Sequence, residues 1–138
     1  MRERRSEWRL ASTERSLPFL RRELTALLTG SGLSVDERYD VVLSVSEAAS
    51  NAVEHAQDPR EPFFDVVAEV GDSTVTITVT DHGRWIPQTA SAFRGRGLAM
   101  MHVLADTTVA TGAGGTTVTI RKSSALGAED PEPIGRAS

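Results

Sequence analysis

Hydrophobic positions along this chain follow two kinds of spacing, one typical of strands and one typical of helices. Near the start, Trp8 and Leu10 alternate with charged residues, which predicts an edge strand with one buried face over residues 7–12. The next segment carries leucines at helical spacing and ends at glycines, which predicts a helix over about residues 17–30. These leucines are Leu20, Leu24 and Leu27.

A second, longer helix is predicted from Ser34 to roughly His55. Ser34 followed three residues later by Glu37 is a capping-box pattern, and two prolines within residues 57–62 end the helix. Apolar residues at helical spacing predict a stripe that faces the core. The stripe consists of Val41, Val45, Ala48 and Ala52, and it is widened by Val42, Ala49, Val53 and Ala56.

The second half of the chain is predicted to consist mostly of strands. Residues 63–70 and 74–80 are rich in β-branched residues and are joined by a tight turn. In the second of these runs valine and isoleucine alternate with threonine, which predicts one apolar and one hydroxylic face. A loop over residues 81–97, a helix over 98–106 and a strand–turn–strand unit over 107–122 follow.

This order of elements predicts an α+β fold, a two-layer sandwich in which helices lie on one face of a mostly antiparallel sheet. We expect one domain over residues 1–122. Residues 123–138 are rich in serine, alanine, glycine, proline and acidic residues, so we expect them to form a disordered tail.

Composition narrows the possible functions. Of the 138 residues, 39% are hydrophobic and only 5% are aromatic, so valine, leucine, isoleucine and alanine must build most of the core. The net charge of −4 does not favour a nucleic-acid partner, because that would call for a basic face. The absence of cysteine excludes disulfides, thiolate zinc sites and thiol catalysis within this sequence.

The sequence also shows no membrane or export signal. No apolar run approaches the roughly 20 residues that a membrane span needs. The charged residues at the start are not followed by the hydrophobic segment of a signal peptide. We therefore expect a cytoplasmic protein.

The second predicted helix carries polar residues among its alanines and valines. Glu47, Asn51 and His55 lie four residues apart and Ser44 precedes them, so we expect these four on one side of the helix and the apolar residues on the other. The helix alone leaves two interpretations open. Most such stripes are solvated faces, but this one carries short side chains, as a helix that lines a cleft would. In a cleft, a carboxylate and a carboxamide one turn apart suit a base beside a hard-metal ligand.

Two later motifs also have two interpretations each. Asp81 and Gly83 follow the predicted strand over residues 74–80. In one interpretation they are ordinary turn residues. In the other, Asp81 places a carboxylate at the mouth of the sheet, and Gly83 lets a flat ring approach the backbone. Gly95 and Gly97 precede a predicted helix, and they form a plain loop or a site where free N–H groups bind an anion.

Taken in order, these motifs resemble the Bergerat-type ATP-binding fold of gyrase-like ATPases, histidine kinases and certain serine kinases. The shared order is a helix with Glu-x3-Asn, two strands, Asp-x-Gly, and Gly-x-Gly before a helix. Within that fold, the segments SEAASNAVEHA, DHG, GRGL and GTTVTIRK resemble the anti-sigma-factor serine/threonine kinases. The resemblance covers about residues 8–122 and implies that ATP and Mg²⁺ are bound.

The resemblance implies roles for the residues of the first two motifs. Glu47 matches the catalytic base, which takes the proton of a serine or threonine hydroxyl on a protein substrate. Asn51 matches the Mg²⁺ ligand, and His55 matches a polar position at the end of the same motif. Asp81 matches the residue that accepts a hydrogen bond from the adenine amine, and Gly83 packs beside the ring.

The resemblance also implies roles for the later motifs. The loop that wraps the triphosphate is matched by the segment GRGL, which follows Arg94. A threonine near the start of the last strand matches a hydroxyl that supports adenine binding. The implied phosphate-binding residues are Gly95, Gly97 and Leu98, with charge neutralised by Arg94 or Arg96, and the implied hydroxyl belongs to Thr116 or Thr117.

The family implies two protein partners and a homodimer. One partner is an RNA polymerase sigma factor, which the kinase sequesters, and the other is a STAS-type anti-anti-sigma protein, which it phosphorylates. Residues 7–12 could supply the sheet edge through which members dimerise. The alternative hypothesis is a non-catalytic, nucleotide-binding regulator that sequesters its partners. Trp85 favours this alternative, because the family often has a second glycine at that position.

Overall fold

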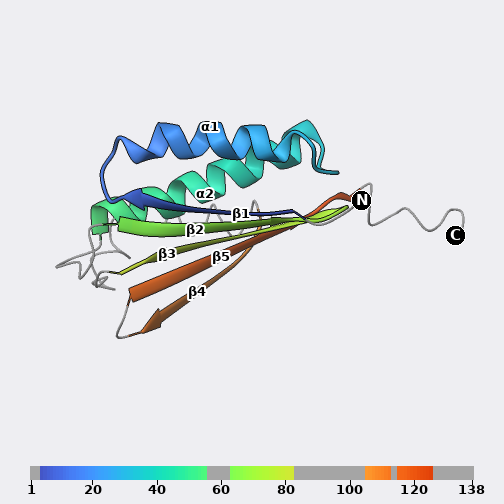
Figure 1. The fold of residues 1–138 in the computed structure, drawn as a ribbon. Helices are drawn as coiled ribbons and strands as arrows, with labels where there is room; N and C mark the ends of the chain where they lie inside the picture. Colours follow the sequence, from blue (N-terminus) through green and yellow to red (C-terminus); the bar gives the residue numbers. More distant parts are fainter. Residues whose placement is uncertain (1–3, 56–62, 83–104, 113–114, 126–138) are drawn as a thin grey trace, which may run out of the picture.

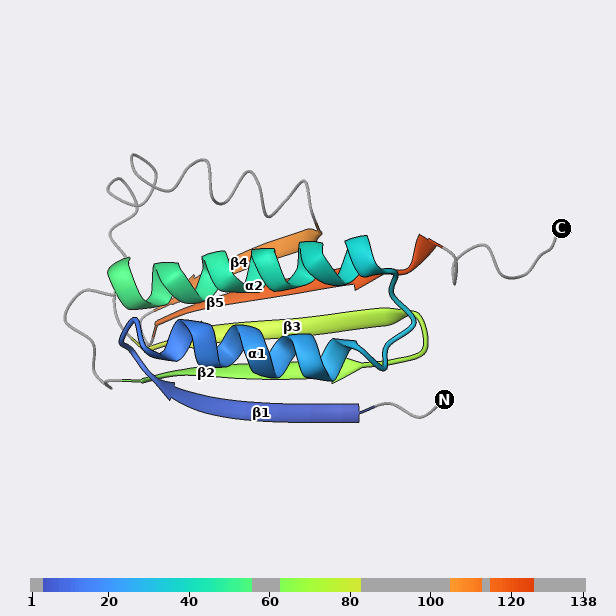
Figure 2. The same ribbon diagram turned by 90° about the horizontal axis from the view of Figure 1, so that it is seen from above.

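The computed structural model describes residues 4–55, 63–82, 105–112 and 115–125. These residues form two helices that lie side by side over one face of a five-stranded sheet (Figures 1 and 2). The opposite face of the sheet carries no helix of the described residues (Figure 1). In chain order the elements are β1 (Arg4–Ala11), α1 (Ser16–Leu28), α2 (Val35–His55), β2 (Phe63–Val70), β3 (Thr74–Asp81), β4 (Asp106–Gly112) and β5 (Gly115–Ser123).

The sheet has the order β1-β2-β3-β5-β4, and every neighbouring pair of strands is antiparallel. The predicted α+β sandwich is therefore confirmed, and β1 is an edge strand as predicted. This strand begins earlier than predicted because Arg4 pairs with Val70 at the far end of β2.

The core lies between the helices and the sheet. Val75, Ile77 and Val79 on β3 are buried on the helix-covered face, while the alternating threonines face the other way and stay partly exposed. The predicted division of this strand into an apolar and a hydroxylic face is confirmed. On α1 the core-facing row differs from the predicted leucines, since Leu28 is fully buried and Leu27 only partly so. The row in contact with the core follows four-residue steps through Ser16, Leu20, Leu24 and Leu28.

Helix α2 begins with the predicted capping box. The backbone N–H of Ser34 donates to Glu37 Oε1 over 2.8 Å, and the N–H of Glu37 donates to Ser34 Oγ over 3.1 Å. The apolar stripe of this helix is buried against the sheet, as predicted. Its described residues are Val41, Val45, Ala48, Ala49 and Ala52, with Val42 and Val53 partly buried at its sides.

The predicted bounds of helix α1 and of the helix over residues 98–106 need correction. Helix α1 stops at Leu28 rather than near residue 30, because the Leu28 carbonyl accepts a turn hydrogen bond of 2.9 Å from the N–H of Ser31. The helix predicted over residues 98–106 lies mostly outside the described residues. Its last residue, Asp106, is the first residue of β4 instead, where it pairs with Arg121 of β5.

The start of the predicted disordered tail is also ordered. Ser123 ends β5, and the buried Ser124 donates its N–H to the Ser73 carbonyl over 2.7 Å. The N–H of Ala125 donates to Glu37 Oε2 over 2.9 Å. This backbone bond, followed by that from Ser34, lowers the pKa of Glu37. These bonds join the end of the sheet to its β2–β3 turn and to α2, and residues 126–138 lie outside the described part.

Candidate functional site

The polar stripe of α2 lies at the border of the core rather than opposite the apolar stripe. Ser44 and Asn51 are fully buried, at 0% exposure, and Glu47 is partly buried. Successive helical residues are separated by about 100°, so Ser44 and Asn51 come beside Val45 and Ala52 on the helix surface. The expectation that polar and apolar residues take opposite sides is therefore wrong. The exposed side of the helix includes Tyr39 and Glu54 instead.

Asn51 is buried and has no hydrogen-bond partner among the described residues. Neither its side-chain oxygen nor its side-chain nitrogen has a hydrogen-bond partner among the residues that the structure describes, and the buried hydroxyls of Ser44 and Ser46 share this property. A buried polar group without a partner costs about 1–3 kcal/mol. A helix that binds a ligand must present hydrogen-bonding atoms that are not already used within the protein. Among the described residues, the carboxamide of Asn51 meets this requirement. The interpretation of a solvated helix face is therefore wrong for Asn51.

A second set of buried polar groups lies where β3 ends and β5 begins. Asp81, the last residue of β3, is 2% exposed and pairs in register with Thr116 of β5, which is 1% exposed. Paired residues of neighbouring strands point to the same face, here the helix-covered one. The hydroxyl of Thr116 has no hydrogen-bond partner within the described part of the chain. Figures 1 and 2 both show the C-terminal half of α2 over this end of the sheet, so Asp81, Thr116 and Asn51 belong to the same end of the domain.

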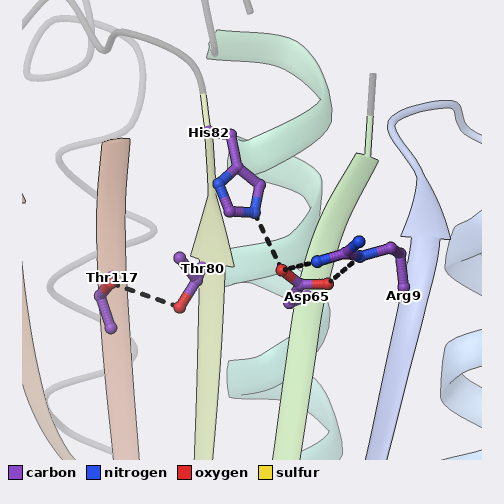
Figure 3. A network of polar contacts seen from close by, with 5 residues as sticks. All are labelled: Arg9, Asp65, Thr80, His82 and Thr117. Carbon is purple, nitrogen blue, oxygen red and sulfur yellow. Dashed lines mark hydrogen bonds and ion pairs between the residues drawn. The ribbon is translucent and has the colours of Figure 1, made fainter. Parts of the chain in front are cut away.

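The two candidate threonines of β5 point to opposite faces. Thr117 faces away from the helices, and its hydroxyl oxygen lies 3.3 Å from that of Thr80 (Figure 3). Thr116 shares its face with Asp81. The sequence prediction named either threonine for the same role. Because only Thr116 lies on the face of Asp81, the structure favours Thr116 and separates Thr117 from the site.

Gly115 is a residue of this region that the sequence prediction left out. Its φ of +144° is a conformation that residues with a side chain rarely adopt. A Cβ atom added to it would lie 1.9 Å from the carbonyl oxygen of Asp81. Glycine therefore allows β5 to start directly against the end of β3. The run of glycines before Thr116 was the available sequence signal.

A polar network on the helix-free face was not predicted at all. Arg9 donates two hydrogen bonds to Asp65, from Nε over 2.8 Å and from an Nη atom over 3.3 Å. His82 Nε2 lies 2.9 Å from Asp65 Oδ2, so Asp65 joins three strand segments (Figure 3). The hydrogen bond from Arg9, supported by that from His82, lowers the pKa of Asp65. No local motif could reveal this network, because Arg9 and Asp65 lie 56 positions apart in the sequence.

The remaining predicted site residues lie outside the described part of the chain. The structure places His55 at the end of α2, but its side chain is not described. The phosphate-binding part of the site therefore stays a prediction. The phosphate-binding residues concerned are Arg94, Gly95, Arg96, Gly97 and Leu98, and both Gly83 and Trp85 also lie outside the described residues. Within the described residues, none of the helices has the length and apolar character needed to span a membrane.

Residues 10–122 match the histidine kinase-like ATPase domain family, and the chain belongs to this family. It is 30% identical over 87 residues to an anti-sigma F factor of Clostridium botulinum (strain Alaska E43 / Type E3), a match that covers 62% of this chain and 61% of that protein. It is 29% identical over 79 residues to the serine-protein kinase RsbW of Staphylococcus epidermidis, which covers 56% of this chain and 50% of that protein.

Solved structures share the fold of this chain. The crystal structure of the RsbU and RsbW domains of a Mycobacterium tuberculosis protein is similar with a TM-score of 0.68 and 27% identity, over 88% of this chain and 34% of that chain. A histidine kinase domain of Erythrobacter litoralis shares the fold with a TM-score of 0.55 and 22% identity, over 81% of this chain and 61% of that chain. The alignments with the curated relatives thus span half to about three fifths of those proteins.

Proposed function

We propose that this chain is an ATP-dependent serine/threonine protein kinase that also acts as an anti-sigma factor. In this proposal it sequesters an RNA polymerase sigma factor and phosphorylates a STAS-type anti-anti-sigma protein. Membership of the histidine kinase-like ATPase domain family supports ATP binding, and the similarity to an anti-sigma F factor and to RsbW supports the two partners.

Asn51 carries the proposal. Its buried carboxamide has no partner among the described residues and lies one helical turn from Glu47, on the half of α2 above Asp81 and Thr116. A side-chain amide oxygen is a hard donor of the kind that Mg²⁺ accepts, and Mg²⁺ at a nucleotide needs only one or two protein oxygens. The residues present therefore fit a site for a nucleotide with Mg²⁺.

The proposed chemistry assigns a separate task to each residue. Glu47 accepts the proton of the substrate hydroxyl as that oxygen attacks the γ-phosphorus of ATP and ADP leaves. Asn51 would hold Mg²⁺, which when bound neutralises phosphate charge. Asp81 accepts a hydrogen bond from the adenine amine, and the Thr116 hydroxyl supports the same end of the nucleotide. Such a division suits phosphoryl transfer, which depends on positioning and charge neutralisation more than on covalent steps.

The experiment combines nucleotide binding with phosphoryl transfer. The purified chain is incubated with radiolabelled Mg-ATP and a candidate STAS-domain protein, and binding is measured separately by calorimetry. Glu47→Gln is expected to bind ATP and to lose transfer by a factor of at least about 100, as for a general base. Asn51→Ala is expected to weaken Mg-ATP binding itself. Glu54→Gln, an exposed glutamate on the same helix, is the matched control. A Glu47→Gln variant that still transfers phosphate would rule out Glu47 as the base.

Trp85 supports a second candidate function, a non-catalytic regulator that binds nucleotide and sequesters its partner. A bulky indole stands where the family resemblance leads us to expect a second glycine. Thermal stability separates this candidate from a domain without a nucleotide site, because a ligand that binds only the native state raises the melting temperature. Stabilisation by Mg-ATP with no transfer to any STAS partner would favour the regulator.

The proposal extends to assembly and location. The edge strand β1 is available for pairing with a second copy, which supports a homodimer. Both proposed partners act in the cytoplasm, and we place this chain there with them.

A further inference from the structure

We propose that the network of Arg9, Asp65 and His82 positions the end of β3 for nucleotide binding. This inference rests on the proposed function, because it assigns an indirect role at the site that contains Asp81. The three residues do not touch the nucleotide in this account. They hold the backbone from which Asp81 projects.

Asp81 is the last residue of β3 that pairs within the described sheet. The register with β2 ends at Phe64 and Asp81, and the register with β5 ends at Asp81 and Thr116. His82 comes directly after this pair and before Gly83, where the predicted adenine contact continues. Consecutive residues of an extended chain point to opposite faces, so Asp81 points under α2 while His82 points to the helix-free face. A contact that fixes His82 therefore also fixes the direction of the backbone at Asp81.

His82 is held in two ways. Its Nε2 atom lies 2.9 Å from Asp65 Oδ2, and its ring packs against Phe63 with a centroid separation of 5.1 Å and an interplanar angle of 66°. The guanidinium group of Arg9 lies 3.9 Å from the centroid of the same Phe63 ring and donates to the other carboxylate oxygen of Asp65. Figure 3 shows the histidine, the carboxylate and the guanidinium in one row across the strands. The row extends the attachment of β3 by one residue beyond its last backbone pair.

A matched ion pair on the same strands allows a clean comparison. Arg5 and Glu69 pair in register on β1 and β2, and Arg5 Nε lies 3.6 Å from Glu69 Oε2. Like Arg9 and Asp65, they lie on the helix-free face, but at the opposite end of the strands from Asp81. If the network only held the sheet together, removal of either pair would have a similar effect. A positioning role predicts an effect on nucleotide binding for the Arg9–Asp65–His82 network alone.

The test measures the dissociation constants of Mg-ATP and Mg-ADP by calorimetry, with melting temperatures recorded for each variant. His82→Leu and Asp65→Asn are expected to weaken the binding of both nucleotides by the same factor, about three- to tenfold, as for the loss of a hydrogen bond of ordinary strength. An equal factor is expected because the network acts at the adenine end. Glu69→Gln is the control and is expected to bind like the wild type.

Rescue by a conservative variant separates positioning from general stability. The amide nitrogen of glutamine occupies about the place of histidine Nε2, while that of asparagine corresponds to Nδ1. His82→Gln is therefore expected to bind within about twofold of the wild type, and His82→Asn to bind as weakly as His82→Leu.

If the wild type binds Mg-ATP, any one of three results would overturn the inference while the proposed function stands. These results are unchanged binding by His82→Leu, failure of His82→Gln to restore binding, and equal weakening of binding by Glu69→Gln. A wild type that binds neither nucleotide would refute the proposed function and this inference together. Should His82→Leu fail to fold, the comparison of the glutamine and asparagine variants still decides.

Discussion

Replacement of Asn51 by leucine is expected to make the protein more stable and unable to bind Mg-ATP. Leucine has the same number of side-chain heavy atoms and the same branching at Cγ as asparagine, and it carries no polar atoms. Asn51 is 0% exposed, and both polar atoms of its side chain are buried without a partner among the described residues. Removing such unpartnered groups is expected to raise the free energy of unfolding by about 1–3 kcal/mol, because the folded state no longer carries the cost of their desolvation. For a domain of this size, each kcal/mol raises the melting temperature by about 3–5 °C.

The assay is thermal unfolding followed by circular dichroism, with and without excess Mg-ATP. The wild type is expected to melt at a higher temperature when the nucleotide is present, because ligand binding to the native state raises its stability. Asn51→Leu is expected to melt higher without nucleotide and to gain nothing from it. Ser50→Ala, which removes only a contact of 3.3 Å with Glu54, is the control and is expected to behave as the wild type in both respects.

Two results would refute this reasoning. A variant Asn51→Leu with a lower melting temperature than the wild type would mean that the carboxamide makes stabilising contacts in the folded protein. A variant that gains as much stability from Mg-ATP as the wild type would mean that Asn51 does not face the nucleotide.

Three further predictions concern the end of the sheet and its ion pairs. Thr116→Val is expected to keep or raise stability and to weaken Mg-ATP binding, whereas Thr117→Val loses a hydroxyl contact of about 0.5–1.5 kcal/mol and leaves the binding constant unchanged in calorimetry. Gly115→Ala is expected to lower the free energy of unfolding in urea by about 1–3 kcal/mol or more, since its φ of +144° strains any side chain; unchanged stability would contradict the close approach to β3. The folded-state pKa values of Glu37 and Asp65 are lowered from 4.5 and 3.8, so the unfolded chain binds more protons in acid. Their stabilisation is fully present above these unfolded-state values and is lost as the pH falls through the lower folded-state pKa values, and Glu37→Gln and Asp65→Asn are each expected to make the acid side of a stability–pH curve less steep.

Local pattern was sufficient to predict most elements of the fold. The alternation of Val75, Ile77 and Val79 with threonines identified a strand with one buried face, and the structure confirms it. Ser34 and Glu37 identified the start of α2, since a capping box is complete within four residues. Both signals are local, and no distant part of the chain was needed to interpret them.

The errors arose where distant contacts decide the structure. The pattern placed Asp106 in a helix, but its pairing with Arg121 makes it the start of β4. It placed Ser124 in a tail, but the N–H of this residue bonds to Ser73 in a turn about 50 positions away. Local pattern could not show which contacts of this kind the folded sheet provides.

The sequence singled out candidate site residues but not their geometry. The sequence singled out Asn51 and Asp81 through spacing and motif order, yet it could not tell whether the polar stripe is solvated or buried. It could not choose between Thr116 and Thr117, because strand register alone decides which of two neighbours faces the helices. The contact between Asp65 and His82 depends on the same register and has no sequence signature.

The measurement that tests the central claim most directly is a calorimetric titration of the purified chain with Mg-ATP, repeated with Asp81→Asn. The account predicts saturable binding by the wild type at one site. It predicts at least about tenfold weaker binding by the variant, since the carboxylate that accepts a hydrogen bond from the adenine amine is lost. Absence of binding by the wild type at millimolar Mg-ATP would contradict the claim that Asn51, Asp81 and Thr116 form a nucleotide site.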